Sequence, residues 1–294
     1  MQNYQQNNLI NTKEKKFCLN NYLSEDIEEY YKSKNGVLFH ADCMSILPKI
    51  KSNSIDTIFA DPPFNLGKIY GKNTNDNIAE YEYIAWCKNW ILECVRIIKP
   101  GGSIFLYNLP KWNILLGAYL SELNMMFRHW IAIDINTSMP ITGRLYPSHY
   151  SLIYYSKGKP NTFKRIRIPV ATCRHCGGEI KDYGGHRKYL NTKGISLKDI
   201  WYDIPPIRHW KFKDKKRAVN ALSTKLVSRA ILMSTNIGDI VLDPFGGSGT
   251  TFDCCEYYNR QWIGIEIDYV EEIVTRLSGK KIQHHATYDY VEEN

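Results

Sequence analysis

The sequence lacks the features that would assign the chain to a membrane or to a secretory route. It contains no run of about 18 apolar residues, the length that a membrane-spanning helix needs. Residues 1–16 are polar, rich in Asn, Gln and Lys, and have no apolar stretch like that of a signal peptide. We therefore expect a cytoplasmic protein whose residues 1–35 form an N-terminal extension, frayed over the first 16 residues.

A disulfide framework is not indicated either, although the chain has eight cysteines. Most of them stand in apolar segments of regular pattern, as buried free thiols do. Without an export signal we expect a reducing compartment, in which such cysteines stay unpaired. The sequence also shows no internal repeats.

Negative charge is scarce in one segment of the chain. The net charge is +8, but residues 157–217 hold 17 Lys and Arg against 5 Asp and Glu, so the rest of the chain is at −4. One basic segment on a neutral-to-acidic body indicates a polyanionic partner such as a nucleic acid. The alternative is an ordinary solvated surface.

Outside the basic segment, short apolar runs alternate with stretches of helical spacing, which indicates βαβ units and a parallel sheet with an antiparallel edge. The expected strands cover residues 36–40, 54–60, 103–107, 127–135, 149–155, 239–243 and 261–267. The expected helices cover residues 44–51, 79–99, 111–124, 223–235, 250–258 and 269–279, and Pro100-Gly101-Gly102 is expected to end the second of these helices. Residues 157–217 show no clear periodicity and are the expected insert between two halves, 36–156 and 218–294.

A glycine-rich segment, Asp243-Pro244-Phe245-Gly246-Gly247-Ser248-Gly249-Thr250, follows one expected strand and opens a helix. Glycines at such a turn let the backbone approach a ligand closely. Glu266 comes 17 residues after Gly249, at the end of the next strand, where doubly wound folds place an acid for ribose hydroxyls. The segment is neither a P-loop nor a G-x-G-x-x-G loop, and it predicts a site for a nucleoside-containing cofactor.

A second segment, Asp61-Pro62-Pro63-Phe64, stands at the carboxyl end of an expected strand, where α/β sheets bind their ligands. A carboxylate and a rigid backbone carbonyl there could accept the two N–H bonds of a conjugated exocyclic amine and pull it toward tetrahedral geometry. Phe64 offers a flat face on which a base could stack. The alternative is a turn after a strand, with Asp61 as a helix cap.

The two segments together resemble the D/N/S-P-P-Y/F/W catalytic motif and the F-x-G-x-G cofactor loop of S-adenosylmethionine (SAM)-dependent DNA amino-methyltransferases of the N6-adenine and N4-cytosine family. The resemblance covers roughly residues 36–280, in the motif order of the β group. It implies a circularly permuted, Rossmann-like α/β fold with a seven-stranded methyltransferase sheet. It also implies catalytic roles for Asp61, Pro62, Pro63 and Phe64, and SAM binding by Asp243, Phe245, Gly247, Gly249, Thr250 and Glu266.

Two further residues are carried over by the same resemblance. Asp42, in His40-Ala41-Asp42, resembles the acid that contacts the cofactor adenine. Lys225 resembles a lysine near the methionine end of the cofactor, although many relatives have Lys-Pro where Leu226 follows here.

The reaction implied is methyl transfer to N6 of a flipped-out adenine in DNA. Asp-Pro-Pro rather than Ser-Pro-Pro favours adenine, and N4-cytosine methylation is the near alternative. Methylation of RNA or of a protein glutamine, and a catalytically silent nucleic-acid-binding module, are further alternatives. No Pro-Cys turn offers the nucleophile that ring-carbon methylation needs.

The basic insert stands where the family carries its target-recognition region. Its candidates for contact with DNA phosphates or base edges are Lys164, Arg165, Arg167, Arg187, Lys188, Arg208, Lys211 and Lys213, interleaved with Tyr183, Tyr189, Trp201 and Trp210. For any single one of them the alternative is surface charge or local packing, so the expectation of DNA contact applies to the segment as a whole. Cys173 and Cys176 form one C-x-x-C that resembles half of a zinc knuckle, with His175, His186 or His209 as further candidate ligands. The alternative is a pair of simple loop cysteines.

The resemblance also implies a prokaryotic setting. The enzyme would belong to a restriction-modification system or act as an orphan modification enzyme. DNA is the expected partner, with a homodimer and a cognate restriction endonuclease as further candidates.

Overall fold

The structure is a computed structural model of the 294-residue chain. The residues that it describes are 16–67, 69–70, 74–134, 142–143, 145, 147–170, 172–173, 175–179, 181–182, 184–185, 187–205, 221–279 and 289–292. Within these ranges, no helix combines the length and the apolar character that crossing a membrane requires.

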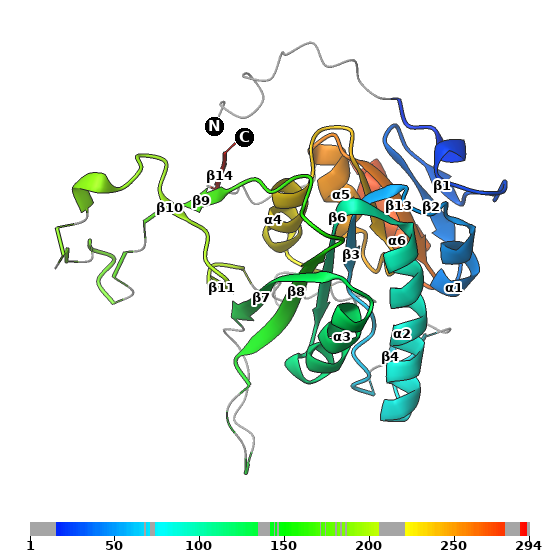
Figure 1. Ribbon diagram of the computed structural model, residues 1–294, viewed down its shortest axis with the longest axis horizontal. Coiled ribbons are helices and arrows are strands. Elements are labelled where there is room, and N and C mark those ends of the chain that lie inside the picture. The colour runs from blue at the N-terminus through cyan, green and yellow to red at the C-terminus, as the bar shows by residue number, and fades with distance from the viewer. Residues whose placement is uncertain are drawn as a thin grey trace.

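A nine-stranded sheet forms the centre of the molecule, in the order β1-β2-β13-β12-β3-β6-β8-β7-β11 (Figure 1). Its strands are β1 (Tyr31–Lys32), β2 (Gly36–His40), β13 (Gln261–Glu266), β12 (Ile240–Asp243), β3 (Ile55–Ala60), β6 (Ile98–Asn108), β8 (His149–Ser156), β7 (Met126–Asp134) and β11 (Ile200–Trp201). β1 pairs antiparallel to β2, β8 lies antiparallel to both of its neighbours, and the remaining pairs are parallel.

The seven longer strands match the seven expected from the sequence, and their order confirms the permuted fold. β12 and β13 come last of the seven along the chain, yet they lie between β2 and β3 in the sheet. The two additional strands are short edge strands: β1 comes from the N-terminal extension and β11 comes from the insert.

Helices cover both faces of the sheet. On one face, α1 (Cys43–Ile46), α2 (Glu80–Ile97) and α3 (Pro110–Glu122) pack on a core that includes Ile58 and Ile104. On the other face, α4 (Thr224–Ser234), α5 (Thr250–Tyr257) and α6 (Val270–Ser278) pack on a core that includes Phe59 and Phe105. Neighbouring residues of β3 and β6 enter opposite cores because successive side chains of a strand point to opposite faces.

We had expected Pro100-Gly101-Gly102 to end the helix before it and to separate it from the next strand, but the tripeptide lies inside that strand. α2 ends at Ile97, and β6 begins at Ile98 and runs through this tripeptide. Gly101 has a positive φ of 76°, and its N–H donates to the Lys157 carbonyl at the far end of β8. The antiparallel neighbour therefore continues the sheet through a sequence that looks like a loop.

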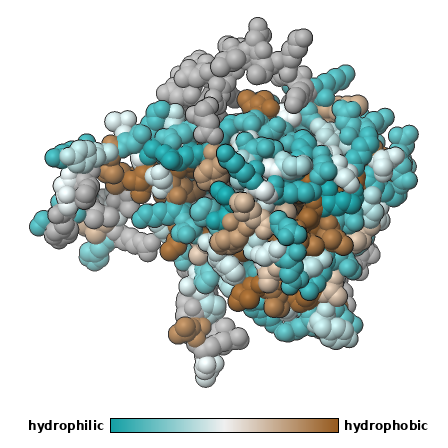
Figure 2. Space-filling view, viewed as in Figure 1, coloured by the Kyte–Doolittle hydropathy of each residue, from teal (hydrophilic) through white to brown (hydrophobic). Residues whose placement is uncertain are grey.

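The insert has more regular structure than its sequence indicates. β9 (Ile166–Ile168) pairs with β10 (Ile195–Ser196) and with β14 (Tyr290–Val291), close to the C-terminus. The short 3-10 helix η3 (Arg187–Tyr189) lies between β9 and β10 along the chain. This part projects from the sheet in Figure 1, and Figure 2 shows hydrophilic side chains over much of it, with hydrophobic ones near β9 and β10.

Four more short elements, two 3-10 helices and two strands, complete the description. The 3-10 helix η1 (Leu19–Asn21) precedes the sheet, and η2 (Leu47–Lys49) continues α1. A separate two-stranded sheet, β4 (Ile69–Tyr70) and β5 (Thr74–Asn75), lies between β3 and α2 along the chain.

Candidate active site

The carboxyl ends of the parallel strands β2, β13, β12, β3 and β6 meet at one edge of the sheet. β12 pairs with β3 through Leu242 opposite Ile58, so the glycine-rich loop after β12 and the Asp-Pro-Pro-Phe segment after β3 are neighbours. Glu266, at the end of β13, is opposite His40 at the end of β2. The fold therefore brings together the segments that the sequence analysis singled out.

Buried hydrogen bonds hold the glycine-rich loop in shape. Asp243 accepts the Phe245 N–H at 2.9 Å and the Thr251 hydroxyl at 2.6 Å. Burial raises the pKa of Asp243 to about 7, although both hydrogen bonds lower it. Gly247 and Gly249 have φ values of 52° and 76°, a region that L side chains rarely adopt, and Gly249 caps α5, where Thr250 is the first helical residue. Asp243 thus shapes the loop rather than facing outward.

Glu266 joins the loop directly. Its Oε2 accepts the Gly247 N–H at 2.6 Å, and its Oε1 accepts the Asp268 N–H at 2.9 Å and the Tyr269 N–H at 3.3 Å. The residue is 8% exposed. Burial raises the pKa of Glu266, against the effect of these hydrogen bonds. A carboxylate has about four acceptor positions, so beside these three N–H groups one position, on Oε2, is left for a hydroxyl donor.

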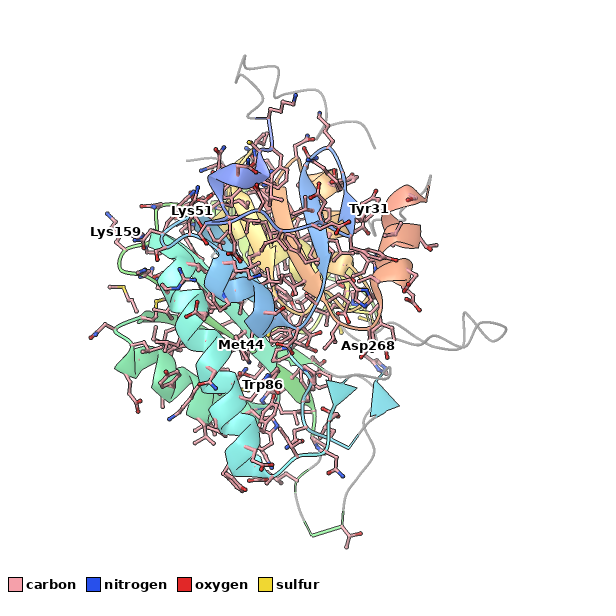
Figure 3. The ribbon with its side chains drawn as sticks, turned by 90° about the vertical axis from the view of Figure 1, so that its right-hand side faces the viewer. Tyr31, Met44, Lys51, Trp86, Lys159 and Asp268 are labelled. Carbon is pink, nitrogen blue, oxygen red and sulfur yellow. The ribbon has the colours of Figure 1, made fainter. Side chains whose placement is uncertain are left out.

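Asp42 lies beside Glu266 at the end of β2. The Ala41 N–H donates to the Glu266 carbonyl at 3.0 Å, and Asp42 is exposed and caps α1 by accepting the Met44 N–H at 2.8 Å. Figure 3 labels Met44 of α1, Trp86 of α2 and Asp268, which follows β13. Asp42 thus has a helix-capping role, and its contact with the cofactor adenine stays a prediction.

Phe245 packs against α2 instead of standing free. Its ring centroid lies 5.5 Å from that of Trp86 and 5.1 Å from that of Trp90. Trp86 in turn lies 5.8 Å from Tyr83. This chain of rings connects the glycine-rich loop to the helix that also supports the Asp-Pro-Pro-Phe segment.

Asp61 follows β3 and is half-buried beside an aromatic cluster. The Phe64 ring lies 5.8 Å from both Tyr107 and Tyr150, and these two tyrosines lie 5.4 Å apart. Burial raises the pKa of both tyrosines, and the Asp61 carboxylate raises it further, which places a negative charge close to both phenols. The arrangement joins one anionic acceptor to three flat apolar surfaces.

The two tyrosines were not singled out from the sequence. Tyr107 ends β6, and Tyr150 lies near the start of β8, whose direction is reversed, so both reach the edge where β3 ends. Only the antiparallel pairing of β8 reveals this. The available signal was an aromatic residue at the end of each expected strand.

Lys225 is placed in an ion-pair cluster. Its Nζ lies 2.7 Å from Asp203 Oδ2 and 3.9 Å from Asp289 Oδ1, and Arg229 pairs with the same two carboxylates. We call these four residues the clasp. A contact between Lys225 and the cofactor stays a prediction.

Two of the basic candidates in the insert have structural partners. Arg167 donates to Glu292 and to the Gly194 carbonyl, and its side chain is 12% exposed. Arg165 lies 3.6 Å from the same Glu292. Arg167 thus secures β9 beside β14, which is the packing role that the sequence left open for any single candidate, and a DNA contact by Arg167 stays a prediction.

The aromatic candidates in the insert also differ from one another. Trp201 is 1% exposed and packs in the core beneath the Arg229 guanidinium, so it has the local packing role that the sequence left open. Tyr189 is exposed, and the Lys188 ammonium lies 5.0 Å from its ring centroid. The Lys164 backbone N–H donates to the Met233 carbonyl. The side chains of Arg187, Tyr183, Arg208, Trp210, Lys211 and Lys213 lie outside the described residues.

Cys173 and Cys176 stand in a tight turn. The Cys173 N–H donates to the Gly178 carbonyl at 2.7 Å, and the Gly177 N–H donates to the Cys173 carbonyl at 2.8 Å. Backbone hydrogen bonds from Cys176 and His175 lower the pKa of the Cys173 thiol. Within the described ranges no group of three His, Cys, Asp or Glu could hold a metal, and His186 and His209 fall outside them. The pair supplies two of the four ligands that zinc takes.

The other cysteines follow the sequence analysis. Cys43, Cys87, Cys94, Cys254 and Cys255 are buried and free, and Cys18 is exposed and free. Burial raises the pKa of each of the five buried thiols, which keeps them protonated and unreactive.

Strand order and site define an α/β protein with a methyltransferase-type sheet, a glycine-rich loop with an acid on the next strand, and an Asp-Pro-Pro-Phe edge. A family model described as DNA methylase (N6_N4_Mtase) matches residues 55–275. The chain belongs to this family of N6 and N4 DNA methylases.

Individual relatives agree with this assignment. The chain is 50% identical over 257 residues to the Type II methyltransferase M.BamHI of Bacillus amyloliquefaciens, covering 87% of this chain and 60% of that protein. It is 33% identical to M.HpaI of Haemophilus parainfluenzae, covering 83% of this chain and 74% of that protein. The solved structure of the PvuII cytosine-N4-specific DNA methyltransferase matches with a TM-score of 0.64 at 19% identity, covering 88% of this chain and 92% of that one, which supports the fold.

Proposed function

We propose that this protein transfers a methyl group from SAM to the exocyclic amino nitrogen of a base in DNA. One observation carries the proposal: the loop that suits a nucleoside cofactor and the loop that suits an amine lie on the paired strands β12 and β3. A methyl donor held by the first loop would therefore lie next to an amine held by the second. Such proximity is a large part of the catalysis of a group transfer.

The residues on the cofactor side fit SAM. Glu266 has one acceptor position left, on Oε2, for a ribose hydroxyl, and Asp42 lies beside it for the adenine. Gly247 and Gly249 leave the loop without side chains at the positions of positive φ, and Thr250 opens the helix that follows. SAM supplies an electrophilic methyl group on sulfur, ready for direct displacement.

The residues on the other side fit a flipped-out base. Phe64 and Tyr150, which are partly exposed and packed against the buried Tyr107, offer stacking surfaces, and stacking is worth roughly 1–3 kcal/mol per base. Asp61 and the Pro62 carbonyl accept the two amine hydrogens, so the nitrogen lone pair turns out of conjugation toward the methyl carbon. The N–C bond forms as the S–C bond breaks, and the amine then releases one proton. Asp61 stabilises the positive charge that develops on nitrogen, which is an interaction stronger in the transition state than in the ground state.

Adenine N6 is the target that the Asp-Pro-Pro motif favours, and cytosine N4 is the second candidate. Both bases present an amino group next to a ring nitrogen, and the acceptors described above suit either. One relative named as a DNA adenine methyltransferase, YhdJ of Escherichia coli, is 30% identical over 82% of this chain, whereas the PvuII enzyme is named as cytosine-N4-specific. The experiment below reports both products separately.

The basic insert, residues 157–217, is the segment proposed to recognise the DNA sequence.

The chain spans 60% of the length of M.BamHI, so its partners are also part of the proposal. Because M.BamHI and M.HpaI are both named Type II methyltransferases, we propose a role in restriction-modification, with a cognate endonuclease acting on the same site and a homodimer as the candidate assembly.

The test is single-turnover transfer of labelled methyl to genomic DNA that carries neither N6-methyladenine nor N4-methylcytosine, followed by mass spectrometry of the nucleosides. Asp61→Ala should lower the rate by about 100- to 1000-fold, the effect of losing one preorganised contact. SAM affinity, measured by calorimetry, should stay at the wild-type value because Asp61 faces the base. Phe64→Ala should act chiefly on base binding. Methylation by Asp61→Ala at close to the wild-type rate would refute the assignment.

A further inference from the structure

The backbone carbonyls of Pro62, Pro63 and Phe64 differ in the hydrogen bonds that they accept. The Pro63 carbonyl accepts the Tyr83 hydroxyl at 2.7 Å, and the Phe64 carbonyl accepts the Trp112 indole N–H at 2.7 Å. Among the described residues, no hydrogen bond reaches the carbonyl of Pro62, which is the one proposed to receive the amine. The carbonyls of Pro63 and Phe64 therefore have donors within the protein, and the Pro62 carbonyl is available to a ligand.

The donor at Pro63 is itself oriented. Tyr83 is 2% exposed on α2, and its oxygen accepts the Asn108 Nδ2 hydrogen at 2.9 Å. Asn108 is fully buried at the end of β6, and its Oδ1 accepts the Leu109 N–H at 2.8 Å, which fixes which end of the amide faces Tyr83. A phenol has one hydrogen to donate. Because Asn108 occupies an acceptor position, that hydrogen is directed to Pro63.

A hydrogen bond that fixes the orientation of the Pro63 carbonyl also fixes the orientation of the Pro62 carbonyl. The Pro62 carbonyl lies in the planar peptide between Pro62 and Pro63. The Pro63 ring fixes φ near −65°, so the only soft dihedral between the two carbonyls is ψ of Pro63. A hydrogen bond to the Pro63 carbonyl restrains that dihedral, and with it the direction of the Pro62 carbonyl.

We propose that Tyr83, oriented by Asn108, is a positioning residue for methyl transfer: through the Pro63 carbonyl it aims the Pro62 carbonyl at the target amine. Trp112 restrains the next carbonyl and with it the start of the Phe64 side chain. The ring centroids of Tyr83 and Trp112 lie 4.8 Å apart, so α2 and α3 form one support beneath the segment. This inference rests on the proposed function and adds to it residues outside both motifs.

The chain offers a matched control. Tyr155 of β8 is 5% exposed and donates its hydroxyl to the Gly117 carbonyl at 2.9 Å, the same kind of buried bond as that of Tyr83. It joins β8 to α3 and does not touch the Asp-Pro-Pro-Phe segment. Tyr83→Phe and Tyr155→Phe therefore remove equivalent bonds, one beneath the site and one away from it.

The experiment measures three quantities for wild type and both variants: the urea midpoint, the SAM affinity by calorimetry, and the single-turnover methylation rate at saturating DNA and SAM. We expect similar losses in the urea midpoint and unchanged SAM affinity for both. Tyr83→Phe should lower the rate by about 10- to 100-fold, since small displacements of catalytic groups have effects up to that size. Tyr155→Phe should keep the rate within about twofold, because a purely structural loss does not act on saturated turnover.

Equal rates for the two variants would overturn the inference while leaving the proposed function intact. A wild-type protein that binds SAM but methylates no DNA would overturn the proposed function itself. Should Tyr83→Phe fail to fold, Asn108→Leu, which removes the amide that directs the Tyr83 hydrogen to the Pro63 carbonyl, replaces it. It is compared with Tyr155→Phe by the same readouts, and equal rates again overturn the inference.

Discussion

Replacing Arg229 with methionine should break the clasp that ties the insert, residues 157–217, to the body. The Arg229 side chain is 1% exposed and makes paired contacts with Asp203, at 2.8 and 2.6 Å, and a 2.7 Å contact with Asp289. Asp203 follows β11 of the insert, and Asp289 precedes β14 of the C-terminal segment. One guanidinium in α4 therefore links three parts of the chain that are distant in sequence.

The magnitude follows from what the substitution leaves behind. Removing one partner of a buried ion pair typically costs about 3–5 kcal/mol, because the remaining charge is buried without compensation. The Asp289 side chain is 3% exposed and would keep only Lys225, at 3.9 Å, whereas Asp203 would keep Lys225 at 2.7 Å. We therefore expect the lower end, about 3 kcal/mol of unfolding free energy, and weaker DNA binding through a less firmly held insert.

The clasp also predicts a dependence of stability on pH. Burial alone would raise the pKa of Asp203, but hydrogen bonds and charge from Arg229 and Lys225 outweigh it and hold the pKa at about 2. A folded-state pKa below the unfolded value stabilises the protein above about pH 4, and this stabilisation is lost as the pH falls from about 4 to about 2. It amounts to about 2 kcal/mol, and Arg229→Met should remove most of it.

Urea unfolding followed by circular dichroism, at pH 7 and at intervals down to pH 3, measures both effects. A triple variant that combines Arg229→Met with Asp203→Asn and Asp289→Asn is the control, because it removes the charges that Arg229 compensates. It should recover part of the lost stability. The reasoning is refuted if Arg229→Met stays within about 1 kcal/mol of wild type, or if the triple variant is no more stable than the single one.

Three further predictions concern the ligands. Gly247→Arg should abolish SAM binding in calorimetry, since the side chain enters the loop at a residue of positive φ; wild-type affinity would show that the site is misplaced. Lys188→Gln, combined with neutralisation of other exposed basic residues of the insert, should flatten the salt dependence of DNA binding by about one phosphate contact per lysine or arginine. Arg167→Gln is the control: it removes the partner of Glu292 and should chiefly lower stability. If the salt slope of the Lys188 variant is unchanged, the assignment of the insert as the DNA-contacting segment is contradicted. Protein purified without added zinc should contain stoichiometric metal that Cys173→Ser with Cys176→Ser removes; substoichiometric metal unaffected by that change would exclude a knuckle.

The sequence alone was sufficient for the elements whose pattern is local. Strands such as β12 and β13 are short apolar runs, and their helices follow at once, so periodicity revealed them and placed the glycine-rich loop between a strand and a helix. The permuted sheet was predicted by a resemblance, because the order of the two motifs along the chain is that of the β group of DNA amino-methyltransferases. The positions of Asp61 and Glu266 at strand ends followed from the same pattern.

The tertiary structure decided what depends on distant partners. Strands of two residues, such as β11 and β14, carry no periodicity of their own and exist because a neighbouring edge offers hydrogen bonds. Arg229 and Arg167 look like any basic residue in the sequence, and only the approach of Asp203 and Glu292 makes them structural. The support of the Asp-Pro-Pro-Phe segment by Tyr83 likewise arises where α2 passes beneath β3. Contacts of this kind are set by packing, and no local pattern of residue types encodes them.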